Sequence, residues 1–222
     1  MVLKGQFLER PTLIQLTNGL VLEGVSHRGE KRPGLLVLPP PPIEGGGMDH
    51  VVGAELAYAI SHAGHPTLRF NFRGVGGSQG AVSKSPGDWL DDARAAMDLA
   101  RENTGGAAPF IATIGASDAI ALKLIELEAI AGLVLINPSL ARPADFESRE
   151  KVTWPLGVVV AEHDSSQERG RWAAVLERLD GRFTLIPGAN RTYQRNLPMV
   201  GQAVASLLSD LTGQGTGGTS GV

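Results

Sequence analysis

Short apolar runs alternate with amphipathic helical segments from residue 35 to residue 211, and this order constrains the fold more than any other feature. The runs lack period-two alternation, which is typical of strands buried on both faces; they are 35–38, 67–72, 110–114, 131–136, 156–161 and 183–186. Helical spacing between them predicts helices at about 49–63, 88–101, 116–128, 172–179 and 198–211. This order predicts an α/β fold, in which helices cover both faces of a mostly parallel sheet.

The N-terminal part departs from this pattern. Residues Thr12 to Val25 are typical of two strands that turn at Asn18-Gly19, a dipeptide that tolerates the positive φ angles of a tight hairpin. We therefore expect an antiparallel hairpin at one edge of the sheet. A chain of 222 residues can bury one large core, and no repeat or inserted lid interrupts it. We expect a single domain over 1–211 and a flexible Gly-rich tail over 212–222.

Composition excludes several classes of function. The absence of Cys excludes a disulfide scaffold, a thiol nucleophile and thiolate metal sites. The 20 basic and 23 acidic residues are spread along the chain, so a concentrated positive face for nucleic acid is not expected. The N-terminal residues lack the apolar core of a signal peptide, and no apolar run approaches the ~20 residues of a bilayer span. We expect a cytoplasmic protein that binds neither nucleic acid nor membrane.

Ligands of such sheets bind at the carboxyl ends of the strands, so the turns that follow the strands are where chemistry is expected. The glycine-rich turn 73–80 does not match a dinucleotide fingerprint, because Gln79 stands at the third glycine position. No pair of histidines with a carboxylate has metal-binding spacing. The sequence therefore predicts no nucleotide cofactor and no metal.

The strand at 110–114 runs into Gly115-Ala116-Ser117-Asp118-Ala119 and then into a helix. This is a G-x-S-x-A pattern, in which small flanking residues allow a sharp turn that presents a nucleophilic serine at the sheet edge. The pattern makes Ser117 a candidate nucleophile, although its hydroxyl needs a general base.

Further motifs accompany this elbow. They are Gly45-Gly46-Gly47-Met48-Asp49, the glycine-rich block 68–80, Ala161-Glu162-His163-Asp164 and Ile186-Pro187-Gly188-Ala189-Asn190-Arg191. With the elbow they resemble the α/β-hydrolase superfamily, specifically its small, lidless, dienelactone-hydrolase-like branch, over roughly residues 33–210. The block 68–80 is the most specific of these motifs. The resemblance implies an α/β-hydrolase fold without a lid, and acyl transfer by Ser, Asp and His in that chain order.

Carried over by position, the resemblance puts Asp164 at the place of the acid and Arg191 at the place of the histidine. A guanidinium stays protonated and cannot act as a base, and no histidine follows His163. The family places these two loops side by side, so we expect an ion pair between Asp164 and Arg191. The alternative is that both are solvated loop charges.

The position of the nucleophile has two interpretations. Matching the following helix without a gap puts Gly115 at the serine position, and Ser117 then starts a helix and satisfies a backbone N–H there. The G-x-S-x-A match keeps Ser117 as the nucleophile, but it needs two extra residues before the elbow and two fewer after it. We favour Gly115 and keep Ser117 as the alternative.

The loop that supplies the oxyanion hole also departs from the family. Pro39-Pro40-Pro41-Pro42 stands where the family has histidines between prolines, and proline has no N–H. Pro41 and its neighbours therefore donate nothing, and only Ile43 and later residues could. Glu44 and His50 follow in the same loop, where either is a candidate for proton transfer.

Three other side chains belong to these turns. We expect His163 to face solvent, while Tyr193 and Arg195 either line the mouth of the site or lie in a mobile loop.

Three hypotheses about function follow. The first is an α/β-hydrolase-fold protein that has lost serine hydrolase chemistry and binds a small acidic or carbonyl-bearing ligand, or a protein partner, at the old site. The second is an ester, lactone or thioester hydrolase that uses Ser117 and Asp164 with an unconventional base such as His50 or His163. The third is a lyase, isomerase or cyclase on the same scaffold. A homodimer is compatible with each.

Overall fold

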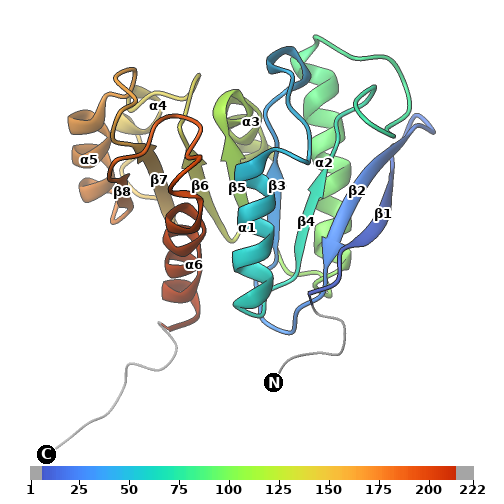
Figure 1. Cartoon of the computed structure of the whole chain (residues 1–222), viewed down its shortest axis with the longest axis horizontal. Helices are drawn as coiled ribbons and strands as arrows, with labels where there is room; N and C mark the ends of the chain where they lie inside the picture. Colours follow the sequence, from blue (N-terminus) through green and yellow to red (C-terminus); the bar gives the residue numbers. More distant parts are fainter. Residues whose placement is uncertain (1–6, 214–222) are drawn as a thin grey trace, which may run out of the picture.

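The structure, a computed structural model, describes residues 7–213 and the side chains as far as residue 210. Within this range the strands form one eight-stranded sheet of order β1-β2-β4-β3-β5-β6-β7-β8 (Figure 1). The strands are β1 (Arg10–Gln15), β2 (Val21–His27), β3 (Leu35–Leu38), β4 (Thr67–Phe70), β5 (Phe110–Ile114), β6 (Gly132–Ile136), β7 (Leu156–Ala161) and β8 (Arg182–Ile186). The pairs β1/β2 and β2/β4 are antiparallel and all others are parallel, which confirms the predicted α/β architecture and its N-terminal hairpin at one edge.

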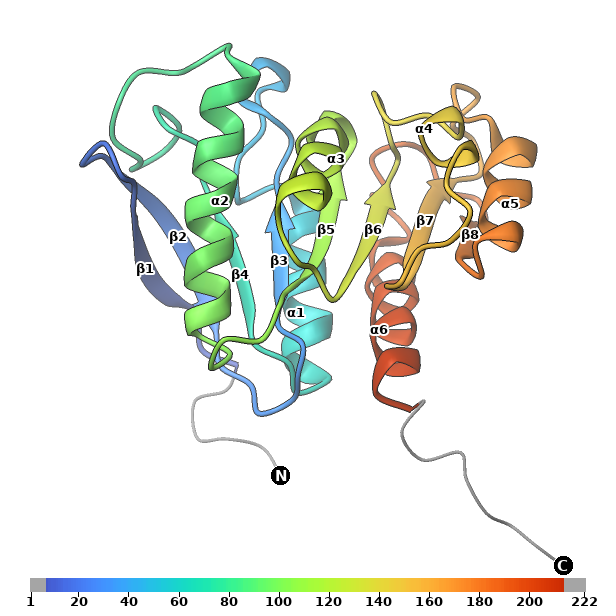
Figure 2. The same cartoon turned by 180° about the vertical axis from the view of Figure 1, so that it is seen from behind.

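Helices cover both faces of the sheet. In Figure 1, α1 (Val51–His62) and α6 (Leu197–Gly213) lie in front of it. The view from behind in Figure 2 shows α2 (Pro86–Glu102) and α3 (Asp118–Leu127) on the opposite face, with α5 (Arg169–Arg178) beside them. The other helical segments are the short α4 (Ala144–Glu147) and two single 3₁₀ turns, η1 (Pro42–Glu44) and η2 (Gly115–Ser117).

The central strands are unalternated because each of their faces meets helices. In β3, Leu35 and Val37 pack in a core with α1 and α6, whereas Leu36 and Leu38 pack in a second core with α2, α3 and α5. All four side chains are buried. Burial on both sides removes any position for a polar residue, and this produces the apolar run.

Three details differ from expectation. β8 is an edge strand rather than a fully buried one, and Leu185 is 38% exposed, because helices cover it incompletely. The hairpin loop is longer than a two-residue turn, and of its central pair only Gly19 has a positive φ. Helix α6 extends to Gly213, two residues into the predicted tail, and residues 214–222 lie outside the described part of the chain.

The glycine-rich block packs through a polar network under the loop that leads to α1. The Asn71 side chain accepts from the Met48 N–H at 2.8 Å and donates to Glu23 at 2.8 Å. Glu23 also accepts from the Gly77 N–H at 2.7 Å. Gly76 has φ +56°, and a Cβ there would lie 2.5 Å from the Asn71 amide nitrogen, so only glycine fits.

Among residues 7–213, none of the helices combines the length and the apolar composition that a bilayer span requires.

Candidate functional site

Loops that follow β3, β5, β6 and β8 meet at the carboxyl edge of the sheet, at the top of Figure 1. They enclose a cavity of about 220 Å³ whose polar lining comes from Glu44, His50, Asn137, Arg191 and Tyr193, with Gly115 between them. Two larger hollows lie elsewhere, between β1 and α2 and at the amino ends of β7 and β8. The small cavity is therefore the one that lies where parallel sheets place their ligands.

Gly115 occupies the strand-to-helix turn at this edge. It follows β5 directly and has φ +61°, a conformation that costs other residues strain. A Cβ built on Gly115 would lie 3.1 Å from the Glu44 carboxylate oxygen Oε2 and 3.7 Å from the Ser139 hydroxyl oxygen. The residue presented to the cavity at the turn therefore carries no nucleophile.

Ser117 lies below this turn and is fully buried. Its hydroxyl accepts from the Ile114 N–H at 2.9 Å and has the carbonyl oxygens of Leu38 at 2.9 Å and Ile114 at 3.0 Å as acceptors. The Ser117 side chain makes no capping hydrogen bond to α3, so the prediction that it satisfies an N–H of this helix is wrong. The N–H that it satisfies is that of Ile114, at the end of β5. The hydroxyl ties β3 to β5 and does not line the cavity.

The loop after β3 offers the cavity a carboxylate in place of N–H donors. The N–H groups of Glu44 and Gly45 bond to the carbonyl oxygens of Pro41 and Pro42, both at 2.9 Å, which forms η1. Pro41 is buried and Ile43 is 58% exposed. The Glu44 side chain accepts from the Ala116 N–H at 3.3 Å. The backbone donor after the elbow, which an oxyanion hole would use, is thus bound to an acidic side chain.

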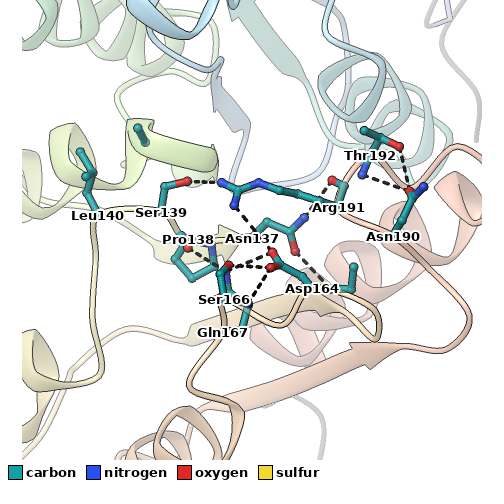
Figure 3. A network of polar contacts seen from close by, with 12 residues as sticks. Asn137, Pro138, Ser139, Leu140, Asp164, Ser166, Gln167, Asn190, Arg191 and Thr192 are labelled. Carbon is teal, nitrogen blue, oxygen red and sulfur yellow. Dashed lines mark hydrogen bonds and ion pairs between the residues drawn. The ribbon is translucent and has the colours of Figure 1, made fainter.

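Asp164 is buried and held by its own loop. Its carboxylate accepts from the Ser166 N–H at 3.0 Å, the Ser166 hydroxyl at 2.5 Å and the Gln167 amide at 3.3 Å (Figure 3). Burial alone would raise the pKa of Asp164, but these hydrogen bonds and the charge of Arg191 lower it below its usual value. Asp164 is therefore an ionised group at neutral pH.

Arg191 reaches from the loop after β8 toward both Asp164 and Ser139, as Figure 3 shows. Its Nη1 lies 3.9 Å from the Asp164 carboxylate, and its Nη2 donates to the Ser139 hydroxyl. The predicted pairing is therefore present as a long ion pair. The Arg191 side chain is 50% exposed, so this pair contributes little to stability.

Asn137 and Tyr193 support the cavity from within. Both have positive φ, +44° and +53°. The Asn137 side-chain oxygen accepts from the Ala161 N–H at 3.1 Å and the Tyr193 hydroxyl at 2.6 Å, and its nitrogen donates to the Arg191 carbonyl at 2.9 Å. Burial raises the pKa of Tyr193 far above its usual value, so the phenol is a neutral donor. Tyr193 is thus a packed part of the site rather than a mobile loop residue.

We expect Tyr193→Phe to lower the free energy of unfolding by about 1 kcal/mol, because it removes a buried hydroxyl that donates to Asn137 at 2.6 Å and lies 3.4 Å from the Val159 carbonyl, and it keeps the ring. Urea denaturation measures the change. Tyr58→Phe is the matched control, because Tyr58 is 59% exposed, and it should leave the midpoint unchanged. Equal midpoints for wild type and Tyr193→Phe would show that the bond to Asn137 contributes nothing.

The remaining candidates separate into two groups. His50 lines the cavity, and its Nδ1 accepts from the Val52 N–H at 3.3 Å, which leaves the proton on Nε2. Burial lowers the pKa of His50, and Glu44 offsets this only in part. His163 and Arg195 are exposed and outside the cavity lining. His50 is therefore the histidine at the site, and it is neutral near pH 7.

Sequence reasoning missed three residues that shape the site. Asn137 directly follows the buried run 131–136, and a polar residue at the end of such a strand was an available signal. Ser139 lies two residues further along the same turn. Asp118 stood inside the G-x-S-x-A pattern, yet its role is to hold the turn with Ser139: its Oδ2 accepts from the N–H groups of Ser139, Leu140 and Ala141 at 2.7–3.0 Å.

Structural comparison places the fold among the α/β hydrolases. An α/β serine hydrolase homologue from Coxiella burnetii aligns over 90% of this chain and 97% of its own, with a TM-score of 0.75 and 24% identity. A lidless α/β serine hydrolase from Xanthomonas campestris aligns over 96% of this chain and 97% of its own, with a TM-score of 0.70 and 22% identity. Est1E from Butyrivibrio proteoclasticus, with ferulic acid bound, aligns over 90% of this chain and 99% of its own, with a TM-score of 0.72 and 15% identity. The chain has the lidless α/β-hydrolase fold.

Sequence comparison is more limited. No protein-family model matches the chain. A segment of 75 residues is 40% identical to an uncharacterised protein of Rickettsia prowazekii. The match covers 34% of this chain and 31% of that relative, so the two share about a third of their lengths.

Proposed function

We propose that this chain is a dienelactone-hydrolase-like protein with a degenerate triad, which has lost serine hydrolase chemistry and binds a small ligand in the cavity beside Gly115. One observation carries the proposal. The residue with positive φ after β5 is Gly115, so the turn offers no hydroxyl to an ester carbonyl.

Two further features support this. Arg191 stands where a general base is needed, and its guanidinium holds its proton at any pH that a protein tolerates. Glu44 faces the backbone donor of Ala116, where an oxyanion would need positive charge, so its carboxylate repels the developing charge. Nucleophile, base and oxyanion stabilisation are each affected, and the loss of any one is enough to slow acyl transfer by orders of magnitude.

The hydrolase alternative requires Ser117 to act in the cavity. Its buried hydroxyl is shared among β3 and β5 backbone groups, and freeing it would break the joint between these strands. The lyase, isomerase or cyclase alternative has Glu44 and His50 in the cavity lining, but no feature of the site favours a particular reaction.

Fluorophosphonate labelling read by intact mass tests the proposal. We expect no mass increase of the folded wild type and p-nitrophenyl ester turnover at the level of buffer, while an active serine hydrolase in the same assay is labelled fully. Labelling whose modified peptide contains Ser117, with turnover above buffer, would overturn it.

Ser117→Ala serves as the control variant for this assay. It should behave as the wild type does toward the probe and lose about 1–3 kcal/mol of stability, because the Leu38 carbonyl and the Ile114 N–H lose a buried partner. Peptide mapping of the labelled wild type locates any reactive residue even where this variant fails to fold.

A further inference from the structure

Two groups of opposite charge, Glu44 and Arg191, line the cavity beside Gly115, and both are exposed at its mouth. The Glu44 oxygen Oε2 lies 3.1 Å from the position of a Cβ on Gly115, and the Ser139 hydroxyl lies 3.7 Å from the same point. That hydroxyl accepts from the Arg191 guanidinium, so it holds the cation near the same turn as the Glu44 carboxylate. A small molecule above Gly115 therefore has an anion and a cation within reach.

Both groups retain unused hydrogen-bonding capacity. A guanidinium has five N–H donors, and the Arg191 side chain uses one on Ser139, while its contact with Asp164 at 3.9 Å is too long for a hydrogen bond. Among the described residues, the second Glu44 oxygen has no hydrogen-bond partner. The same holds for the His50 nitrogen Nε2, whose proton makes it a third donor at the cavity.

Glu44 and Arg191 are not paired with each other: the Arg191 charge is partly balanced by the ionised Asp164 carboxylate at 3.9 Å, whereas Glu44 has no cationic partner among the described residues. No ion pair within 4.0 Å joins them in the described part of the chain, although both line the same cavity. A lone anion in the cavity would meet the negative charge of Glu44, and a lone cation would leave the unused N–H donors of Arg191 without an acceptor. A molecule that carries both charges satisfies both groups, because each of its ends faces the opposite sign.

Size and lining restrict the ligand further. The volume of about 220 Å³ is below the roughly 300 Å³ at which pockets begin to accept drug-sized molecules. The remaining walls include the buried apolar side chains of Val52, Ile114 and Ile136. Such a space accepts a few heavy atoms with a short aliphatic part.

We propose that this cavity binds a small zwitterionic amino acid, with its ammonium group on Glu44 and its carboxylate on Arg191 and the His50 Nε2–H. The inference rests on the proposed loss of hydrolase activity, since a nucleophilic side chain at position 115 would crowd the Glu44 carboxylate that the ligand contacts. It names the class of ligand that the old site now takes.

Isothermal titration calorimetry of the full-length protein tests the charge pattern. The probes are L-alanine, β-alanine and γ-aminobutyrate, whose two charges lie at increasing separation, with propionate and propylamine as singly charged controls. We expect at least one zwitterion to bind at least 10-fold more tightly than either control, and to shift the Ala116 N–H in ¹H–¹⁵N spectra. Equal binding of propionate and the best zwitterion would overturn the assignment of Glu44.

Charge-removing variants locate the contacts. Glu44→Gln and Arg191→Gln should each weaken binding of the best zwitterion at least 10-fold. Glu177→Gln and Arg28→Gln remove one exposed charge of each sign outside the cavity lining and should bind as the wild type does. Unchanged binding in Glu44→Gln or Arg191→Gln would overturn the proposal, as would the absence of binding by all three zwitterions.

Failure of this inference is distinct from failure of the proposed function. Absence of zwitterion binding together with absence of fluorophosphonate labelling contradicts the ligand class alone. Labelling at Ser117 contradicts the loss of hydrolase chemistry whatever the calorimetry shows.

Discussion

Asp118→Ala is expected to lower the free energy of unfolding by about 2–4 kcal/mol, because it leaves three backbone donors without their shared acceptor. The Asp118 carboxylate accepts from the N–H groups of Ser139, Leu140 and Ala141 and is fully buried at the start of α3. These bonds fix the turn that carries Ser139, and Ser139 in turn holds Arg191. The variant should therefore also weaken ligand binding at the cavity.

Asp118→Asn is the matched control for this prediction. Its amide keeps an acceptor oxygen for the three donors and removes only the charge, so the loss should be smaller than in Asp118→Ala. Urea denaturation measures the loss of unfolding free energy in both variants, provided that the dependence of this free energy on urea concentration is the same as in the wild type. Equal losses in the two variants would show that the hydrogen bonds to the 139–141 turn are not what Asp118 contributes.

Ionisation of Asp118 makes the free energy of unfolding depend on pH. Burial raises the pKa of Asp118, and its bonds to the backbone of 139–141 offset this only in part. Because the folded state holds the proton more tightly than the unfolded state, ionisation costs stability as pH rises above about 4, the usual pKa of Asp. The stability of wild type relative to Asp118→Asn should therefore decrease from pH 4 upward, and a constant difference would contradict the raised pKa.

The fold could be predicted from the sequence because burial on both faces leaves a direct record. The run 35–38 contains no polar position, since Leu35 and Leu36 enter different cores. The same rule failed at 183–186, where the apolar residues are those of a half-covered edge strand. Composition records how apolar a strand is, but not whether a neighbour lies beyond it.

The nucleophile position shows what a motif can and cannot determine. The G-x-S-x-A pattern is defined by letters, whereas the elbow is defined by a backbone with positive φ directly after a strand, and Gly115 meets that condition. The strand end at Ile114 was predicted correctly, and Gly115 was favoured because the following helix matches the family without a gap. The sequence did not predict that Ser117 is buried with its hydroxyl bound to the Leu38 carbonyl, because these two residues are 79 positions apart.

The polar supports of the cavity could not be predicted for a similar reason. Asn137 joins Ala161, Tyr193 and Arg191, which come from the end of β7 and from the loop after β8. The Glu44 contact with Ala116 spans 72 positions. Such contacts depend on where loops lie after the sheet has formed, and neither periodicity nor local turn chemistry encodes that placement.

Asp92→Ala is expected to have the largest effect on stability, about 3–5 kcal/mol, because it removes the buried carboxylate that accepts three hydrogen bonds from Arg73 and leaves the partly exposed Asp88 as its remaining carboxylate partner. Arg73 lies in the turn that follows β4, within the glycine-rich block, and is 8% exposed. Its Nε and Nη2 donate to Asp92 at 2.9 and 2.7 Å, and its own backbone N–H donates to the same carboxylate at 2.9 Å. Asp92 is fully buried in α2, so no water replaces it when it is removed.

Asp88→Asn provides the contrast that assigns this cost to burial. Asp88 also binds Arg73, through Nη1 at 2.7 Å, but its side chain is 39% exposed and solvent can take its place. We expect a loss of about 1 kcal/mol or less from this variant. Equal losses of unfolding free energy for Asp88→Asn and Asp92→Ala in urea denaturation would contradict this assignment. They would show that burial of the carboxylate does not determine how strongly Arg73 attaches the glycine-rich block to α2. A larger loss for Asp92→Ala means that this block, and the loop toward α1 that packs on it through Asn71, depends on one buried carboxylate outside the cavity.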